Sequence, residues 1–152
     1  MSRAPFQILV FPYTRSDDSN DYVYAIFRRA KEGYWQGIAG GGEDEEKPLE
    51  AAMREANEEA GISLNSRYMS LKSSSTHSVV DVIGYFMWGP DTFVIPEYCF
   101  GVELDVKDIS LSDEHTEYKW VTYEEAREML KWDSNRVAIW ELNQRLIGDS
   151  SK

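Results

Sequence analysis

The sequence predicts an α/β protein in which helices cover both faces of one mixed β-sheet. Its 152 residues suit a compact domain with a sizeable hydrophobic core. Runs of β-forming residues are interspersed with segments whose apolar residues recur at helical spacing. No repeat, low-complexity tract or linker separates them, so one sheet sandwiched between helices is the expected architecture. We expect a single domain over residues 1–148 and a frayed tail over residues 149–152.

The first 42 residues predict a hairpin and one further short strand. Residues 6–13 and 22–29 are rich in β-formers and are separated by a polar turn, so they form a hairpin with a long loop. Residues 34–38 are expected to form a short strand. The three consecutive glycines at 40–42 are expected in a loop, because they lose too much backbone entropy inside a regular element.

Pro48 and Gly61 mark the ends of the clearest helix. Proline is favoured in the first turn of a helix, and glycine readily adopts the left-handed conformation that follows the last turn. Between them, one apolar stripe at helical spacing consists of Leu49, Ala52, Met53, Ala56 and Ala60. This stripe predicts a helix that packs against the sheet.

The rest of the chain predicts further strands and two more helices. The expected strands cover residues 67–75, 79–88, 94–104 and 117–121. Thr122 and Glu125 form a capping box, which opens a helix that extends through Leu130. A last amphipathic helix is expected over residues 134–147.

The net charge of −11 restricts the partners of the protein. Binding a nucleic-acid polymer requires clustered Lys and Arg, so such a partner is not expected. A small anionic substrate stays compatible, because a divalent cation held by carboxylates reverses the local charge. No segment approaches the roughly 18–20 apolar residues that span a bilayer. We expect a cytoplasmic protein without a membrane partner, either a monomer or a homodimer, in which the single Cys99 is a buried thiol.

Three carboxylates lie close together on the helix that begins at Pro48. Glu55, Glu58 and Glu59 share an arc of about 100° and repel one another by a few tenths of a kcal/mol per pair. This arrangement indicates a hard cation between them, Mg²⁺ or alternatively Mn²⁺. A solvated acidic face without a ligand is the alternative.

The neighbouring glycines favour the cation-binding interpretation. A glycine loop beside the helix N-terminus would let phosphate oxygens approach the backbone amides closely. Gly40 and Gly41 are therefore candidate substrate-binding residues. Acidic metal ligands beside a phosphate-binding loop indicate phosphoryl chemistry.

A motif in fixed register runs from these glycines into the helix. It consists of Gly40, Glu46 and the run Arg54-Glu55-Ala56-Asn57-Glu58-Glu59-Ala60-Gly61-Ile62. The motif resembles the Nudix box throughout its span, and each defining polar and glycine position matches. The resemblance implies the Nudix fold, an α/β/α sandwich with a mixed sheet. It also implies a hydrolase that acts on phosphoanhydride bonds.

The resemblance implies a role for each charged residue of the box. Glu55 and Glu59 would be the main metal ligands, and Glu58 would be a further ligand or a water-orienting acid. Glu46 and Arg54 would form a supporting salt bridge. Water would attack phosphorus while metal ions neutralise charge on the bridging oxygens.

Short segments outside the box resemble the dihydroneopterin triphosphate pyrophosphatases, which are also assigned as dATP pyrophosphohydrolases. They are Trp35-Gln36, Glu114-His115, Tyr118-Lys119-Trp120 and Ser134-Asn135-Arg136. This resemblance makes Glu114 an additional metal ligand or the general base, with an exposed polar turn as the alternative. Arg28 and Arg3 are candidates for phosphate contacts, because guanidinium groups bind phosphate oxygens in a bidentate manner. A surface ion pair is the alternative for Arg28.

The favoured function is cleavage of dihydroneopterin triphosphate, or of a dNTP such as dATP, to the monophosphate and pyrophosphate. Dinucleoside polyphosphates, ADP-ribose and nucleotide sugars are alternative substrates within the same family. A Nudix-fold sensor that binds a nucleotide without hydrolysis is another alternative. It is less favoured because Glu55, Glu58 and Glu59 are all present.

Overall fold

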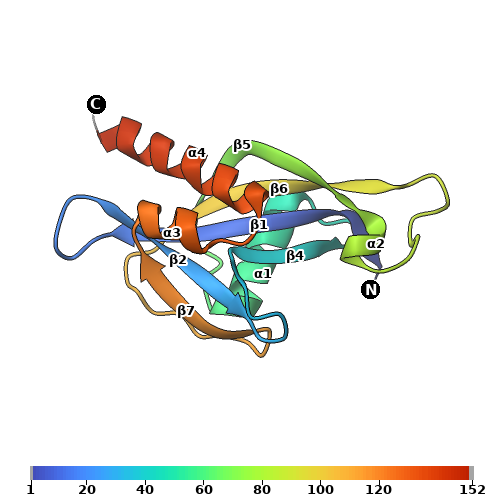
Figure 1. Ribbon diagram of the computed structural model, residues 1–152, viewed down its shortest axis with the longest axis horizontal. Helices are drawn as coiled ribbons and strands as arrows, with labels where there is room; N and C mark the ends of the chain where they lie inside the picture. Colours follow the sequence, from blue (N-terminus) through green and yellow to red (C-terminus); the bar gives the residue numbers. More distant parts are fainter. Residues whose placement is uncertain (1, 151–152) are drawn as a thin grey trace.

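The computed structural model describes residues 2–150 (Figure 1). Its strands are β1 (Arg3–Arg15), β2 (Tyr22–Arg29), β3 (Trp35–Gln36), β4 (Ile38–Glu43), β5 (Arg67–Ser78), β6 (Val94–Glu103) and β7 (His115–Val121). Its helices are α1 (Pro48–Ala60), α2 (Val79–Val82), α3 (Tyr123–Met129) and α4 (Asp133–Ser150). The seven strands of this described part belong to one sheet.

The sheet is mixed, as the sequence predicts. Its central order is β3-β2-β1-β6-β5, with β4 paired to β1 and β7 paired to β2. The pair β1–β6 is parallel, and the other pairs are antiparallel. β1 pairs with β2 near Tyr13 and with β4 from Arg3 to Val10. The strands β2 and β4 therefore share the edge of β1 that lies opposite β6.

Helices cover both faces of this sheet, which confirms the predicted α/β/α sandwich (Figure 1). Side chains alternate between the faces along each strand. Ile8 and Val10 of β1 thus belong to the core that contains the buried alanines of α1. Leu9 and Phe11 belong to the core formed with α3 and α4. Cys99 lies in this second core and is buried, as predicted.

The three consecutive glycines lie inside strand β4, so the prediction of a loop is wrong. β4 pairs antiparallel with β1, and its hydrogen bonds offset the entropy cost of the glycines. A Cβ atom on Gly40 would lie 2.7 Å from each carboxylate oxygen of Glu55. One on Gly41 would lie 2.7 Å from the guanidinium group of Arg3. Glycine is therefore required by close packing against side chains of α1 and β1.

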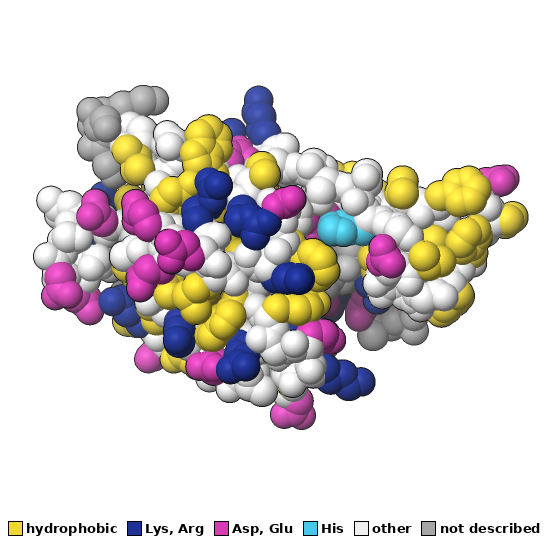
Figure 2. Space-filling model, viewed as in Figure 1, with side chains coloured by type: hydrophobic (Ala, Val, Ile, Leu, Met, Phe, Trp, Pro, Cys, Tyr) yellow, Lys and Arg dark blue, Asp and Glu magenta, His cyan; other side chains and the backbone are white. Residues whose placement is uncertain are grey.

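Residues 79–88 do not form the strand that their β-forming residues predicted. β5 ends at Ser78, and the chain continues as the short helix α2 and a loop. The Ser78 hydroxyl caps α2 by accepting a hydrogen bond from the Val80 amide at 3.3 Å. Apolar side chains of this region are exposed and gather over the projecting end of the molecule (Figure 2). They are Val80, Tyr85, Phe86, Met87, Phe93 and Val94.

The C-terminal elements agree with the predictions to within two residues, except at the end of α4. The capping box is confirmed, because the Thr122 hydroxyl accepts from the Glu125 amide at 3.2 Å and the Glu125 carboxylate accepts from the Thr122 amide at 2.9 Å. Helix α4 continues to Ser150, beyond its predicted end. Residues 151–152 of the expected tail lie outside the described residues. In the described part of the chain, no helix is long and apolar enough to cross a membrane.

Candidate active site

Helix α1 holds the three box carboxylates at different depths. Its ends are those that the sequence predicts, with Pro48 in the first turn and Gly61 at a left-handed φ of 69°. Its buried alanines fix one face against the sheet. Glu59 is 3% exposed, whereas the side chain of Glu55 is 15% exposed and that of Glu58 is 58% exposed. Glu55 and Glu59 therefore face the protein, and Glu58 faces solvent.

Arg54 connects the box carboxylates to β4 and to the turn that follows it. Its Nε and Nη2 atoms donate to both carboxylate oxygens of Glu46, at 2.8 and 3.1 Å, which is the ion pair that the sequence predicts. Nη1 donates to Glu55 at 2.9 Å and to Glu58 at 3.2 Å. Nη2 also donates to the carbonyl oxygen of Gly41. The hydrogen bond to Glu46 raises the pKa of Arg54, so the guanidinium stays charged.

Glu59 is buried where no other described side chain or amide donates a hydrogen bond to its ionised carboxylate. Neither of its carboxyl oxygens is paired within the described residues. The carboxyl group of Glu114, just before β7, lies beside it. Burial, together with the neighbouring groups of Glu114 and Glu55, raises the pKa of Glu59 to about 10. Ionised carboxylates only accept hydrogen bonds, so a proton or a cation must lie between Glu59 and Glu114.

The chemistry of these carboxylates fits a divalent cation. Glu55, Glu59 and Glu114 offer only oxygen ligands, the donor type that Mg²⁺ and Mn²⁺ prefer. Burial raises the pKa of Glu55 as well, and a bound cation would favour its ionised form. Among residues 2–150, no three His, Cys, Asp or Glu side chains are arranged to hold a metal ion as they stand. Because Glu55 is bound by Arg54, cation binding would exchange this ion pair for a metal contact.

A cleft of about 770 Å³ adjoins these carboxylates. Glu55 and Glu114 line it, so the structure brings together residues 59 positions apart in the chain, from α1 and from the loop before β7. Gly40 and Arg3, two of the predicted substrate-binding residues, line it too. The cleft therefore combines the box carboxylates with groups that can contact an anionic substrate.

Two other predicted phosphate contacts do not take the positions expected for them. Arg28 does not line the cleft but pairs with Glu117 at 3.0 Å, which is the surface ion pair left open by the sequence. Gly41 packs against the guanidinium of Arg3, as described above. Because it lies in strand β4, it is not part of a loop at the N-terminus of α1. The phosphate-binding loop inferred from the glycines is therefore absent from this described region.

Several cleft residues were not identified from the sequence. Arg29, rather than Arg28, lines the cleft and pairs with Glu32 at 3.0 Å. Residues of β2 before Arg28 are buried on both faces, so alternation does not indicate which arginine faces the cleft. A register irregularity between the two arginines also interrupts the alternation. Trp132 is a further lining residue, and its ring contacts that of Tyr34 edge to face, with centroids 5.3 Å apart.

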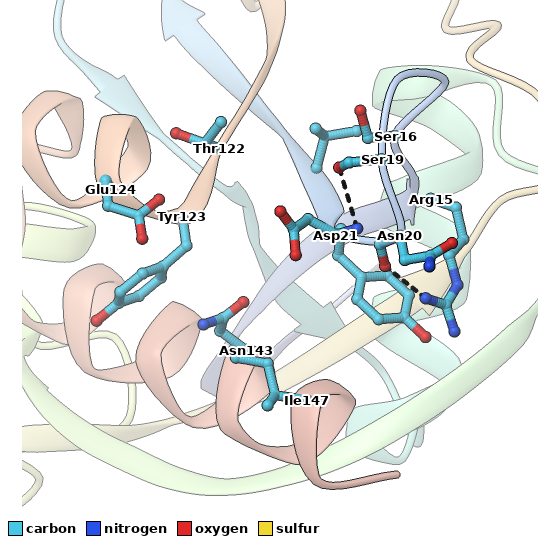
Figure 3. A pocket seen from close by; sticks show the side chains of 12 residues that line it. Arg15, Ser16, Ser19, Asn20, Asp21, Thr122, Tyr123, Glu124, Asn143 and Ile147 are labelled. Carbon is cyan, nitrogen blue, oxygen red and sulfur yellow. Dashed lines mark hydrogen bonds between the residues drawn. The ribbon is translucent and has the colours of Figure 1, made fainter. Parts of the chain in front are cut away.

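A second cavity, of about 620 Å³, lies between the turn joining β1 to β2 and the helices α3 and α4 (Figure 3). Figure 3 shows Asp21 of the turn across the cavity from Tyr123 and Asn143 of the helices. Asn143 accepts a hydrogen bond from the Tyr24 hydroxyl at 2.6 Å. None of the box residues lines this cavity, so the cleft at Glu55 is the candidate active site.

A sequence model of the NUDIX domain matches residues 9–140. The chain belongs to the Nudix family. It is therefore an enzyme of the Nudix pyrophosphohydrolase family, whose members typically use a divalent metal and bind small nucleotide substrates. The predicted recognition of the box and the predicted fold are both confirmed.

Several relatives of this Nudix protein are known. The dihydroneopterin triphosphate diphosphatase of Haemophilus influenzae is 28% identical over 134 residues, which cover 87% of this chain and 83% of the relative. A crystal structure of a Listeria monocytogenes protein assigned to the NUDIX hydrolases is 38% identical, with a TM-score of 0.85 and coverage of 96% and 97% of the two chains. The Escherichia coli dihydroneopterin triphosphate pyrophosphohydrolase is 25% identical, with a TM-score of 0.74 and coverage of 93% and 98%.

Proposed function

We propose that this Nudix protein is a Mg²⁺-dependent pyrophosphohydrolase that converts a nucleoside triphosphate-like molecule to its monophosphate and pyrophosphate. The observation that carries the proposal is the buried, unpartnered carboxyl group of Glu59 beside Glu114, next to a cleft large enough for a nucleotide. A side chain in this position is unfavourable unless a cation or proton shares it. Mn²⁺ would fit the same oxygen ligands.

The carboxylates of the site would bind the cation and orient the attacking water. Glu55, Glu59 and Glu114 would hold the cation, with the solvent-exposed Glu58 as a further ligand once substrate is bound. When bound, the cation supplies neutralisation of phosphate charge and lowers the pKa of the attacking water. Glu58, Glu59 or Glu114 would orient that water or accept its proton, since each carboxylate is an acceptor.

The arginines of the site would either bind the phosphates of the substrate or hold the carboxylates in position. Arg3 and Arg29 both line the cleft and would contact phosphate oxygens in a bidentate manner. Gly40 gives the Glu55 carboxylate room beside β4, and Gly41 gives the same room to the guanidinium group of Arg3. Arg54 and Glu46 would hold Glu55 and Glu58 in position before the cation binds.

The proposed substrate is dihydroneopterin triphosphate or a dNTP such as dATP. The named relatives at 27–28% identity support this class, since they are dihydroneopterin triphosphate diphosphatases aligned over most of this chain. Tyr34 and Trp132 in the cleft wall provide aromatic surface for a pterin or purine ring. ADP-ribose, nucleotide sugars and dinucleoside polyphosphates are the alternative substrates.

The first experiment is a substrate screen with Mg²⁺ that measures pyrophosphate and orthophosphate separately. We expect pyrophosphate to be released fastest from dihydroneopterin triphosphate or a dNTP. Cleavage only of ADP-ribose or of diadenosine polyphosphates would contradict the substrate assignment but retain the hydrolase. Metal-dependent nucleotide binding without turnover of any substrate would contradict hydrolysis and indicate a sensor.

A further inference from the structure

The cleft has a polar wall that the phosphate chemistry does not use. Gln7 of β1, Glu97 of β6 and His77 of β5 line it. Gln7 and Glu97 are paired in register on parallel strands, so their side chains lie on the same face of the sheet. Adjacent strands are roughly 4.8 Å apart, which sets the distance between the two backbones. The wall thus places an amide beside a carboxylate, and neither residue belongs to the Nudix box.

Ser75 and His77 of the neighbouring strand β5 hold the Glu97 side chain in place. Its side chain is only 7% exposed. The Ser75 hydroxyl donates to Oε1 at 3.2 Å, and His77 Nε2 lies 3.4 Å from Oε2. Within the described residues, each oxygen thus has one protein partner, whereas a carboxylate can accept about four hydrogen bonds in total. Glu97 therefore retains acceptor capacity for a ligand in the cleft.

This cluster is not a second nucleophilic centre. The Ser75 hydroxyl is 3.2 Å from the same His77 nitrogen that approaches Glu97. A Ser-His-acid triad needs the serine and the acid on opposite nitrogens of the ring. The arrangement instead orients the Glu97 carboxylate as a hydrogen-bond acceptor.

The chemistry of Glu97 limits what it can contact. A triphosphate repels a carboxylate, so Glu97 would face a part of the substrate that donates hydrogen bonds. On the basis of the triphosphate hydrolysis proposed above, we propose that Glu97 binds the N–H edge of the substrate's heterocycle. This contact selects a 2-amino-4-oxopyrimidine ring, as found in pterins and in guanine, over adenine, so it ranks dihydroneopterin triphosphate above dATP among the substrates proposed above.

The neighbouring residues complete the match to such a ring. A 2-amino-4-oxopyrimidine edge presents an amino group and a ring N–H, both donors, next to a carbonyl oxygen. Glu97 would accept from the two donors. Gln7 would donate its amide N–H to the carbonyl, since its own Oε1 accepts from Arg3 at 2.7 Å. Adenine offers an amino donor next to a ring nitrogen that only accepts, so it would make a single hydrogen bond to Glu97.

The test compares three purine deoxyribonucleoside triphosphates that differ only at this edge and adds dihydroneopterin triphosphate. kcat/KM for pyrophosphate release is measured with dGTP, dITP, dATP and dihydroneopterin triphosphate. dITP lacks the 2-amino group and removes one donor. We expect kcat/KM for dGTP and dihydroneopterin triphosphate to exceed that for dATP by at least about tenfold, and dITP, which keeps the ring N–H and the carbonyl, to fall between dGTP and dATP. Equal kcat/KM for dGTP, dITP and dATP would overturn the proposal without any variant.

Glu97→Gln is the matched variant. We expect it to lower kcat/KM for dGTP by about tenfold or more, mainly through KM, and to lower kcat/KM for dATP by a smaller factor, because adenine donates only one hydrogen bond to Glu97. Glu103→Gln on the same strand is the control, because Glu103 pairs with the exposed Arg67 at the surface. An equal loss for dGTP and dATP in Glu97→Gln would show a structural role and contradict the proposal.

A binding measurement separates this proposal from the proposed function. If no triphosphate is hydrolysed, the hydrolase assignment fails, but calorimetry with dGMP, dIMP and dAMP still tests the base contact. Tighter binding of dGMP than of the other two would support Glu97 as the recognition residue. Equal binding of the three monophosphates would overturn it.

Discussion

At the residue scale, Glu59 is a buried carboxylate that receives no hydrogen bond from a donor among residues 2–150. Burial and the carboxyl groups of Glu114 and Glu55 together raise its pKa to about 10, so the metal-free protein holds a proton there. This state is costly for folding, because the chain has to bury a group that water would otherwise solvate. Residues whose burial is unfavourable for stability are characteristic of sites that bind a ligand.

Replacing Glu59 therefore has opposite effects on stability and on activity. In Glu59→Gln, the amide can donate to the Glu114 carboxylate without a shared proton. We expect the metal-free variant to unfold at the same or a higher temperature than the wild type, while hydrolysis falls by at least about a hundredfold. Mg²⁺ should raise the unfolding temperature of the wild type but not of the variant. Retained turnover would contradict the assignment of Glu59 as a metal ligand.

At the scale of elements, β4 and α1 are joined through side chains that need the glycines. Gly40 faces Glu55 across the β4–α1 contact, where an added Cβ atom would meet the carboxylate oxygens at 2.7 Å. Gly40 and Gly41 pair with Ile8 and Gln7 of β1, and the register is irregular only beyond Gly41, before Glu43 pairs with Arg3. The strand therefore determines where Glu55 can lie.

Gly40→Ala should impair catalysis more than folding. The new methyl group would displace Glu55 from its position beside Arg54, so we expect kcat to fall by about tenfold or more, consistent with losses at groups that support metal ligands. Gly148→Ala is a control in α4, where no atom lies within 4 Å of an added Cβ. It should leave kcat unchanged and raise stability by up to about 1 kcal/mol. Equal kcat in Gly40→Ala and wild type would contradict the packing argument.

Glu141 of α4 fixes the irregular part of β5. It accepts hydrogen bonds from the Lys72 and Ser73 amides at 2.8 and 2.7 Å, beside the register irregularity between Ser70 and Ser74. Burial alone would raise the pKa of Glu141. These amides, with the Ser73 hydroxyl and Arg145, outweigh burial and lower the pKa to about 2. The ionised carboxylate thus connects a helix to a strand that α4 packs against.

The stabilisation from Glu141 should depend on pH. Because its folded pKa is depressed, the stabilisation is complete above the ordinary value of 4.5 and is lost as pH falls toward about 2. At pH 7, Glu141→Gln should lower the free energy of unfolding by about 2 kcal/mol. Urea unfolding at pH 7 and pH 3 should show this difference shrinking at the lower pH. The exposed Glu128→Gln is the control; a difference for Glu141→Gln that is constant with pH would contradict the argument.

At the scale of the whole molecule, the sequence predicts the sandwich and the box helix because both depend on local patterns. Apolar spacing and the end residues Pro48 and Gly61 define α1. The sequence does not predict that Glu59 is buried and Glu58 is exposed. The two residues are adjacent on one arc of the helix, so only the packing of the helix distinguishes them. The sequence also does not predict that Arg29, and not Arg28, lines the cleft. Which arginine faces the cleft depends on a register irregularity between β2 and β7. Long-range packing, absent from local patterns, therefore decides which side chains reach the cleft.

The acidity of the whole chain makes the bound cation a condition for substrate binding. With a net charge of −11, the metal-free protein repels a triphosphate, which itself carries several negative charges. We expect a dNTP analogue with a non-hydrolysable α,β-methylene bridge to bind in Mg²⁺ and to give no measurable heat in EDTA. With Mg²⁺ and the analogue at about 100 times its Kd, the protein should be stabilised by about 2.7 kcal/mol.

Salt distinguishes a bound cation from general screening of this charge. Raising NaCl weakens long-range repulsion but supplies no ligand for Glu55, Glu59 and Glu114. Binding of the analogue in EDTA should therefore stay absent at high NaCl, and Mg²⁺ should restore it in the wild type but not in Glu59→Gln. If NaCl alone restored binding, the carboxylates would act only through their overall charge. The cation would then have no specific site in α1, because screening would suffice to bring the triphosphate into the cleft.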